Sequence, residues 1–356
     1  MCIRDRNRFY SKDSLENLMA FGLALFCTSI LLVLLGVSPW STFIAILEGS
    51  VLGLDSLSRV FVITSIMSLS AFALIVTFSC NMWNIGVEGQ MMLGAIGAVF
   101  VARSFIGDTL LSIPFMIIAA MCFGGIFGLI CGLLKTKGSV HEIFAGLGLD
   151  FVAAGLIVYL VIGPWKKEGI ASTSGTDIIP EMSWFPHLFD FKFPIIPILL
   201  FGSMYLILRF IYAKTSLGLK LKSVGSNTNA FSRLGLSPDM YILFGFLIAG
   251  AVVGLAGAIQ VGSIYHKLVP YISGGYGFLG ILIALVSGRK LSIAIVVSAF
   301  FACLVVGGST LQIKLGLHAS LPGIIQASIV LFWLMIKASS VHIKLINAVS
   351  KSYGHS

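Results

Sequence analysis

The segment Asn81–Ala95, with the sequence NMWNIGVEGQMMLGA, decides the fold of this 356-residue chain. It joins two apolar runs, Val60–Cys80 and Ile85–Phe105, with almost no loop between them. Each run is long enough to cross a hydrocarbon core of about 30 Å. The junction nevertheless contains Glu88, and a carboxylate at the centre of a membrane helix costs roughly 2.5–3.5 kcal/mol on insertion scales. We therefore expect the junction to face a cavity or a partner rather than lipid.

Two interpretations of this junction are open. In the first, Gly86 and Gly89 break the helix, and the freed backbone lines an aqueous path together with Asn84, Glu88 and Gln90. In the second, the junction is a tight cytoplasmic turn, and Glu88 caps the helix that follows it.

The composition of the whole chain also indicates a membrane protein. Hydrophobic residues make up 58% of the chain and charged residues 10%, with a mean hydropathy of +1.03. A soluble domain carries about 25% charged residues. The net charge of +9 does not suggest nucleic-acid binding, because the basic residues lie in short loops between apolar runs. The six cysteines have no paired spacing, and we interpret them as small buried hydrophobes.

The apolar pattern predicts an all-α polytopic membrane protein of about ten transmembrane helices, some of them broken or re-entrant. Residues 1–17 form a cytoplasmic arm (residues 1–6 resemble translated adapter sequence), 18–337 the transmembrane domain and 338–356 a cytoplasmic tail. The run Tyr276–Ser287 is short for a full span. The predicted spans are Leu18–Val37, Val60–Cys80, Ile85–Phe105, Leu110–Leu134, Ile143–Ile162, Pro194–Tyr212, Met240–Val261, Tyr276–Ser287, Leu291–Gly308 and Leu321–Ile336.

Ten crossings place both termini on the same side of the membrane. Of the 23 lysine and arginine residues, 16 then lie on that side, which the positive-inside rule makes cytoplasmic. We expect a multi-pass membrane protein. Small residues at GxxxG spacing predict close helix packing in two of the spans. They are Gly124, Gly128 and Gly132 in one span and Gly250, Gly254 and Gly257 in the other.

Two further stretches contain candidate path residues. Ser273–Ile281, with the sequence SGGYGFLGI, opens the short span, and Tyr276 and Phe278 could stack on a sugar or base ring. Interfacial anchoring of these aromatic residues is the alternative. Asp150 lies about two turns inside its span, as a partner of the solute or of a helix, or closer to the interface.

The basic loop Ala213–Asp239 contains a predicted short helix of about two turns. Asn227 suits its N-cap, Gly235 its C′ position, and Pro238 stops any continuation. An ordinary solvated loop attracted to anionic membrane lipid is the alternative. The side chains available for docking on the short helix are Ala230, Phe231 and Leu234.

The sequence contains none of the common catalytic patterns that we sought. It has no GxxxxGK[ST] phosphate loop, no HExxH, no Cys/His cluster with metal spacing and no GxSxG. We therefore expect no catalytic residue, metal site or cofactor in this chain.

Taken together, these motifs resemble the permease family of binding-protein-dependent ABC importers for simple sugars and nucleosides, related to the ribose and branched-chain amino acid permeases. Asn84–Ala95 is similar to the most specific signature of that family, and Ser273–Ile281 to a later block. The stretch Gly225–Leu236 resembles the cytoplasmic segment that couples to the ATPase. Asp150 stands where the family usually has an asparagine.

The resemblance implies a pair of permeases, identical or not, in the bacterial inner membrane, with two cytoplasmic ABC ATPase subunits and an extracytoplasmic solute-binding protein. The chain would carry a nucleoside or simple sugar by alternating access, with ATP hydrolysed by its partners. Alternatives from other classes are a stand-alone ion-coupled transporter using Glu88 and Asp150, and an intramembrane enzyme. The residues implied to couple the chain to the ATPase are Asn227, Ala230, Phe231, Arg233, Leu234 and Gly235.

Overall fold

The structure is a computed structural model that describes residues 3–166, 174–186, 193–316, 318 and 320–336. These residues form helices and connecting segments, and the one isolated bridge named among them joins Lys166 and Thr176 in antiparallel fashion. The predicted all-α class is confirmed. The predicted cytoplasmic tail 338–356 and the first two residues of the arm lie outside the described residues.

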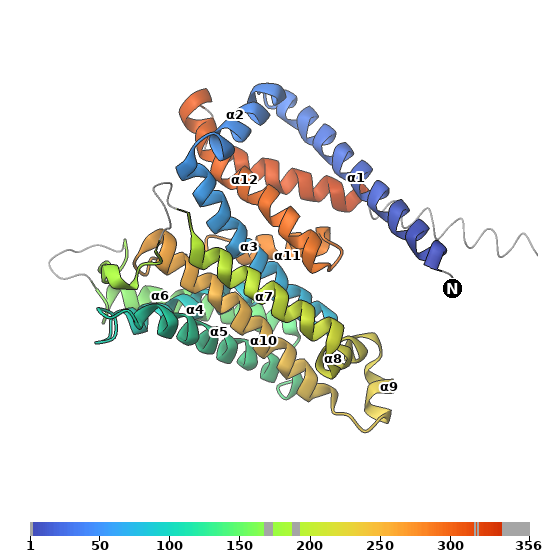
Figure 1. The fold of residues 1–356 in the computed structure, drawn as a ribbon, viewed down its shortest axis with the longest axis vertical. Helices are drawn as coiled ribbons and strands as arrows, with labels where there is room; N and C mark the ends of the chain where they lie inside the picture. Colours follow the sequence, from blue (N-terminus) through green and yellow to red (C-terminus); the bar gives the residue numbers. More distant parts are fainter. Residues whose placement is uncertain (1–2, 167–173, 187–192, 317, 319, 337–356) are drawn as a thin grey trace, which may run out of the picture. The chain divides into compact units, whose positions relative to one another are not determined.

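The chain divides into two units, and the unit Leu57–Ala302 contains all the candidate site residues. Its helices are connected by short segments, apart from the long connection between α6 and α7 (Figure 1). Helix α3 begins just before the start of this unit, and α12 continues well past its end. The helices are α3 (Leu54–Ser79), α4 (Val87–Ala102), α5 (Ser112–Thr136), α6 (Glu142–Ile162), η1 (Glu181–Ser183), α7 (Ile195–Lys214), α8 (Ser216–Ser226), α9 (Thr228–Arg233), α10 (Pro238–Ile259), η2 (Gln260–Tyr265), α11 (Tyr276–Val286) and α12 (Leu291–Leu315).

Six helices among the described residues are long and apolar enough to cross a membrane. They are α3, α5, α6, α7, α10 together with the π-helical turn η2, and α12. Helices α4 and α11 are apolar but shorter, with 16 and 11 residues. These two begin at the two polar, glycine-containing stretches where the sequence predicted broken segments.

The other unit combines residues 1–56 with 303–356, and it contains a helix that the sequence analysis missed. Helix α1 (Ile3–Leu34) includes most of the predicted arm, so the described part of that arm is helical. After a bend of 112°, α2 (Pro39–Val51) follows with a proline in its first turn. Within this unit the Nζ of Lys314 lies 2.6 Å from Oε2 of Glu48. The helix Leu321–Ile336 completes the described part.

Helices α4, α5 and α10 pack through their glycines, which confirms the predicted role of the GxxxG spacing. A Cβ at Gly254 of α10 would overlap the carbonyl oxygen of Ala120 on α5. One at Gly94 of α4 would overlap the carbonyl oxygen of Gly254, and one at Gly124 that of Gly250. We call these contacts the glycine seam. It brings the three backbones close enough to hold α4 firmly in place.

Candidate functional site

The turn before α4 is closed by an amide pair. The side chains of Asn84 and Gln90 are both fully buried, and each donates a hydrogen bond of 3.0 Å to the other. Asn81 adopts a left-handed conformation with φ of 59°, which reverses the chain at the end of α3. Because the amides bond to each other, the structure gives Asn84 and Gln90 a local role in holding the turn.

Glu88 caps a helix, but not the one that contains it. Its side chain is 2% exposed, and its Oε1 accepts a hydrogen bond of 3.0 Å from the backbone N–H of Phe278. Phe278 lies in the first turn of α11, whose own cap residue Gly275 provides no side-chain bond. A carboxylate at this position faces the positive end of the α11 dipole. Glu88 also lies in the first turn of α4, but the hydrogen bond that the structure shows for its carboxylate is to α11, 190 residues away.

The approach of α11 to α4 depends on a glycine. A Cβ on Gly277 would lie 3.0 Å from Oε1 of Glu88 and 3.1 Å from its backbone nitrogen, which is tighter than ordinary van der Waals contact. Before α11, Gly274 and Gly275 have φ of 59° and 77°, a conformation that glycine adopts without strain. The glycine-rich sequence therefore serves both to turn the chain and to bring the start of α11 against Glu88.

Asp150 of α6 binds the first turn of α4. Its Oδ1 accepts a hydrogen bond of 2.7 Å from the backbone N–H of Gly89, and a Cβ on Gly89 would lie 2.8 Å from the same oxygen. The side chain is 8% exposed, and its Oδ2 has no hydrogen-bond partner among the described residues. Gly86 and Gly146 also meet, because a Cβ on Gly86 would lie 3.0 Å from Cα of Gly146. Of the roles left open for Asp150, the structure shows contact with a neighbouring helix, and its role toward a solute stays a prediction.

Glu88 and Asp150 form what we call the acidic cluster. Its distance from the start of α6 and from the end of α11 can be estimated along each helix. Asp150 lies eight residues after Glu142, where α6 begins, and Phe278 lies eight residues before Val286, where α11 ends. At 1.5 Å per residue, both distances are about 12 Å. Glu142 itself is held by Lys135 at the end of α5, with 2.6 Å between Nζ and Oε2.

The aromatic candidates lie in the first turn of α11, the helix whose backbone Glu88 bonds. Phe278 is 45% exposed and Tyr276 is half-buried, both in the first turn of α11. The sequence analysis missed Gln260, which is fully buried at the start of η2, with its Nε2 3.5 Å from the carbonyl oxygen of Ser273. Its Oε1 has no hydrogen-bond partner among the described residues. A glutamine inside the apolar run Met240–Val261 was the signal that could have identified it.

The predicted short helix of the basic loop is α9, which lies near α8 and next to the N-terminal end of α10 (Figure 1). The Oδ1 of Asn227 accepts a hydrogen bond of 2.9 Å from the N–H of Ala230, as expected of an N-cap. Gly235 has φ of 77°, as expected of a C′ residue. The side chains of Ala230, Arg233 and Leu234 are exposed, Leu234 to 76%.

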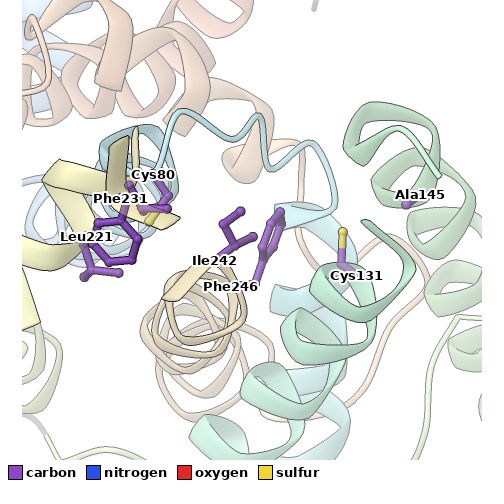
Figure 2. Packing of buried hydrophobic residues seen from close by; sticks show 8 residues of the cluster. Cys80, Cys131, Ala145, Leu221, Phe231, Ile242 and Phe246 are labelled. Carbon is purple, nitrogen blue, oxygen red and sulfur yellow. The ribbon is translucent and has the colours of Figure 1, made fainter. Parts of the chain in front are cut away.

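Phe231 faces the protein interior instead. It is 2% exposed and packs edge-on against Tyr241, with 5.4 Å between the ring centroids. It belongs to a buried cluster whose side chains Figure 2 shows. The prediction that Phe231 docks on a partner is therefore corrected: the residue anchors α9 to this chain. We call the set the α9 anchor, and it comprises Cys80, Cys131, Ala145, Leu221, Val224, Phe231, Ile242 and Phe246.

Part of the long segment between α6 and α7 is bound to the segment that follows α10. The Trp184 ring stacks on His266, with 4.1 Å between centroids, and its Nε1 donates to the carbonyl oxygen of Ile179 at 3.0 Å. The N–H of Ile179 in turn donates to the carbonyl oxygen of His266 at 2.8 Å. These contacts form an ordered surface at the end of the unit opposite α9.

No group of three or more potential metal-binding side chains occurs in the part of the chain that the structure describes. The arrangement contains two short helices with carboxylates at their N-termini and a small exposed helix at one end. Such an arrangement suits the binding and movement of a solute.

Comparison with known proteins identifies the family. The family described as branched-chain amino acid transport system / permease component matches residues 56–338. The chain is 30% identical to the guanosine ABC transporter permease protein NupP of Bacillus subtilis, over 80% of this chain and 82% of that protein. It is 31% identical to the glucose ABC transporter permease protein TsgB13 of Haloferax volcanii, over 87% and 84% of the two chains.

A third relative is the nucleoside ABC transporter permease protein NupB of Lactococcus lactis. It is 26% identical over 74% of this chain and 75% of its own length. The match to a permease family does not favour the alternative of a stand-alone ion-coupled transporter. The chain belongs to the branched-chain amino acid transport system permease family and is a multi-pass inner-membrane permease subunit of an ABC importer.

Proposed function

We propose that this permease imports a nucleoside or a simple sugar by alternating access. The observation that carries the proposal is the extent of the similarity to permeases named for guanosine, glucose and nucleosides, each of which matches about three quarters or more of the chain. The site chemistry supports it, because Tyr276 and Phe278 lie in the first turn of α11, whose backbone is bonded to the buried carboxylate of Glu88. Rings of this kind stack on sugars and bases, and polar groups fix the orientation of the solute.

The topology we propose has about ten crossings, both termini in the cytoplasm, an arm at 1–17, a transmembrane domain at 18–337 and a tail at 338–356. The distribution of 16 of the 23 basic residues supports this orientation. The short helices α4 and α11 then complete their crossings with non-helical segments. This topology places the N-terminal end of α6 and the C-terminal end of α11 at the cytoplasmic face. The acidic cluster then lies about 12 Å inside a core of about 30 Å.

The proposed solute path passes the N-termini of α4 and α11. Asp150 holds the first turn of α4, and Glu88 links α4 to the first turn of α11. Tyr276 and Phe278 would contact the solute directly, whereas Asn84 and Gln90 shape the turn beneath it. Backbone N–H groups at helix N-termini are donors for the hydroxyl and carbonyl groups of a polar solute.

The proposed coupling route begins at α9. Its exposed residues Ala230, Arg233 and Leu234 would contact the ATPase, and Asn227 and Gly235 define the ends of the helix. Phe231 transmits the contact, because the α9 anchor joins α9 to α10. The glycine seam then joins α10 to α4, which holds Glu88. Displacement of α9 would thus reach α11 through buried contacts between rigid helices.

The proposal assigns three kinds of protein partner to the chain. Two ABC ATPase subunits would bind at α9, a second permease of the same or a similar sequence would complete the transporter, and a solute-binding protein would deliver the cargo. The ordered surface that contains Trp184 and His266 lies at the end opposite α9 and suits the last contact. Membrane lipid surrounds the remainder.

The test is transport by the complete complex in proteoliposomes with an Ala230→Asp variant. A buried charge at the ATPase contact should abolish solute-stimulated ATP hydrolysis and uptake while leaving membrane insertion unchanged. Thr109→Asp is the matched control, because Thr109 is an exposed residue in a turn that the proposed topology places outside. Normal coupling in Ala230→Asp would refute the role of α9. Uptake by the chain without any ATPase would refute the proposed function itself.

A further inference from the structure

A cavity unrelated to the proposed path lies where α3 and α7 end and α12 begins. Its volume is about 480 Å³. The lining includes the cations Arg209, Lys222 and Arg289 and the hydroxyls of Ser79, Tyr205 and Tyr212, and it includes no carboxylate. A cavity with three positive charges and several hydroxyl donors is suited to an anion.

The cations are positioned by neighbouring aromatic rings and hydroxyls. The Nζ of Lys222 lies 5.0 Å from the centroid of the Tyr212 ring, and the Cζ of Arg289 lies 5.3 Å from that of Phe78. The Nη1 of Arg209 donates to the Tyr205 hydroxyl at 3.2 Å. Aromatic rings and hydroxyls leave most guanidinium and ammonium donors available to a ligand.

These positive charges have no acidic partner within the described part of the protein. None of Arg209, Lys222 and Arg289 lies within ion-pair distance of a described carboxylate. Three like charges around one cavity repel each other, so an anion that binds there is stabilised by all three. This surplus of positive charge distinguishes the cavity from an internal network of ion pairs.

The surroundings indicate a lipid as the source of the anion. Ile75 and Leu291 add apolar surface to the cavity. On the same helix as Arg209, Leu206 and Phe210 are 63% and 61% exposed, as expected of a helix face in contact with acyl chains. The cavity also lies at the ends of spanning helices, where phosphate headgroups are found. Basic pockets between membrane helices on the cytoplasmic side bind phosphate-bearing lipid headgroups.

We propose that this cavity binds a phosphate group with a net negative charge, supplied by an anionic phospholipid headgroup. Its phosphate oxygens would contact Arg209, Lys222 and Arg289, with the hydroxyls of Tyr205 and Tyr212 as further donors. Binding does not depend on transport. The proposal of a lipid site rests on the proposed function only where it assigns the cavity to the cytoplasmic leaflet.

The test measures lipid retained by the purified full chain in mixed micelles, by native mass spectrometry. Phosphatidylglycerol is the probe, phosphatidylcholine the neutral comparison, and inorganic phosphate the competitor that represents a soluble source. Arg209→Gln and Lys222→Gln should each weaken retention of phosphatidylglycerol about fivefold. The double variant should bring retention to the level of phosphatidylcholine.

Lys220→Gln is the matched control. Lys220 lies on α8 two residues from Lys222 and also faces a tyrosine ring, with 5.4 Å between its Nζ and the centroid of Tyr241, but it does not line the cavity. Its variant removes the same charge from the same helix and should retain phosphatidylglycerol as the wild type does. The thermal stability of each variant shows whether it has folded.

The outcomes separate the possibilities. Loss in Lys222→Gln but not in Lys220→Gln supports the site. Displacement of the lipid by inorganic phosphate at low concentration, with the same dependence on Lys222, supports the phosphate chemistry and assigns it to a soluble source. Equal retention of the two lipids, or equal loss in the two lysine variants, overturns the proposal. None of these results requires active transport, so a failure here leaves the transport proposal untouched.

Discussion

Gly254 is the position of the glycine seam where an added methyl group should be most harmful. A Cβ there would overlap the carbonyl oxygen of Ala120 and lie 3.4 Å from Cα of Gly124. Both neighbours are backbone atoms of α5, which cannot rotate away as a side chain could. In Gly254→Ala the two helices must therefore move apart.

Two opposing terms set the size of the effect. Alanine favours a helix over glycine by about 1 kcal/mol, which stabilises the variant. Adding a methyl group to a close-packed interface costs about 1–3 kcal/mol. If α5 and α10 separate by about 0.5–1 Å, each contact between them loses about a quarter to a half of its dispersion energy. The loss is repeated along α10, because the glycine seam extends along that helix. The packing terms win, so we expect a net loss of about 1–2 kcal/mol in the free energy of unfolding.

The measurement is thermal unfolding in detergent, followed by intrinsic fluorescence. For a chain of 356 residues, a loss of this size should lower Tm by about 1–3 °C. Gly155→Ala is the control, because Gly155 lies within α6 and a Cβ there would meet nothing within 4 Å. Helix propensity alone should leave its Tm unchanged or raised. If Gly254→Ala were as stable as Gly155→Ala, the close approach of α5 and α10 would be refuted.

Three further predictions concern the site. Glu88→Gln keeps a hydrogen-bond acceptor for α11 but removes the negative charge at the N-terminus of that helix. We therefore expect the initial rate of ATP-driven uptake in proteoliposomes to fall by about tenfold. A wild-type rate would contradict this. Asp150→Asn keeps the oxygen that accepts from Gly89 and should transport within about twofold of wild type, whereas an ion-binding role would make it inactive. Phe231→Ala should lower stability by about 3–5 kcal/mol, and Leu234→Ala should leave Tm unchanged while reducing solute-stimulated ATP hydrolysis. Equal stability losses in these last two variants would contradict the anchoring role of Phe231.

Features with local causes could be predicted from the sequence. The cap at Asn227 needs only a side chain that reaches three residues along its own helix, and the left-handed Gly235 needs only the absence of a Cβ. The six long spans follow from apolar length alone. Helix α2 was missed although a local signal was present, because Ser38 and Pro39 are typical of a helix start. Its 13 residues are too few to be recognised as a span.

Features with distant causes could not be predicted. The sequence shows that Glu88 is a carboxylate in an apolar setting and therefore needs a partner, and it shows nothing about which partner. That partner, the N–H of Phe278, lies 190 residues away and is brought close by packing at Gly277. The burial of Phe231 has the same kind of cause, because an aromatic residue on a two-turn helix can face either solvent or core. Only the position of α10 decides between them.

The two short helices differ in how firmly they are held, and this difference indicates which of them moves. In α4, 14 of the 16 residues are buried, and its first turn is tied to Asp150 and its length to the glycine seam. In α11, only four of the 11 residues are buried, and its N-terminus is tied to α4 by Glu88. Segments with little buried surface are displaced at the lowest free-energy cost. We therefore expect α4 to move as one rigid body with α5 and α10, and α11 to move relative to that body, with the carboxylate of Glu88 as the contact that is made in one state and broken in the other.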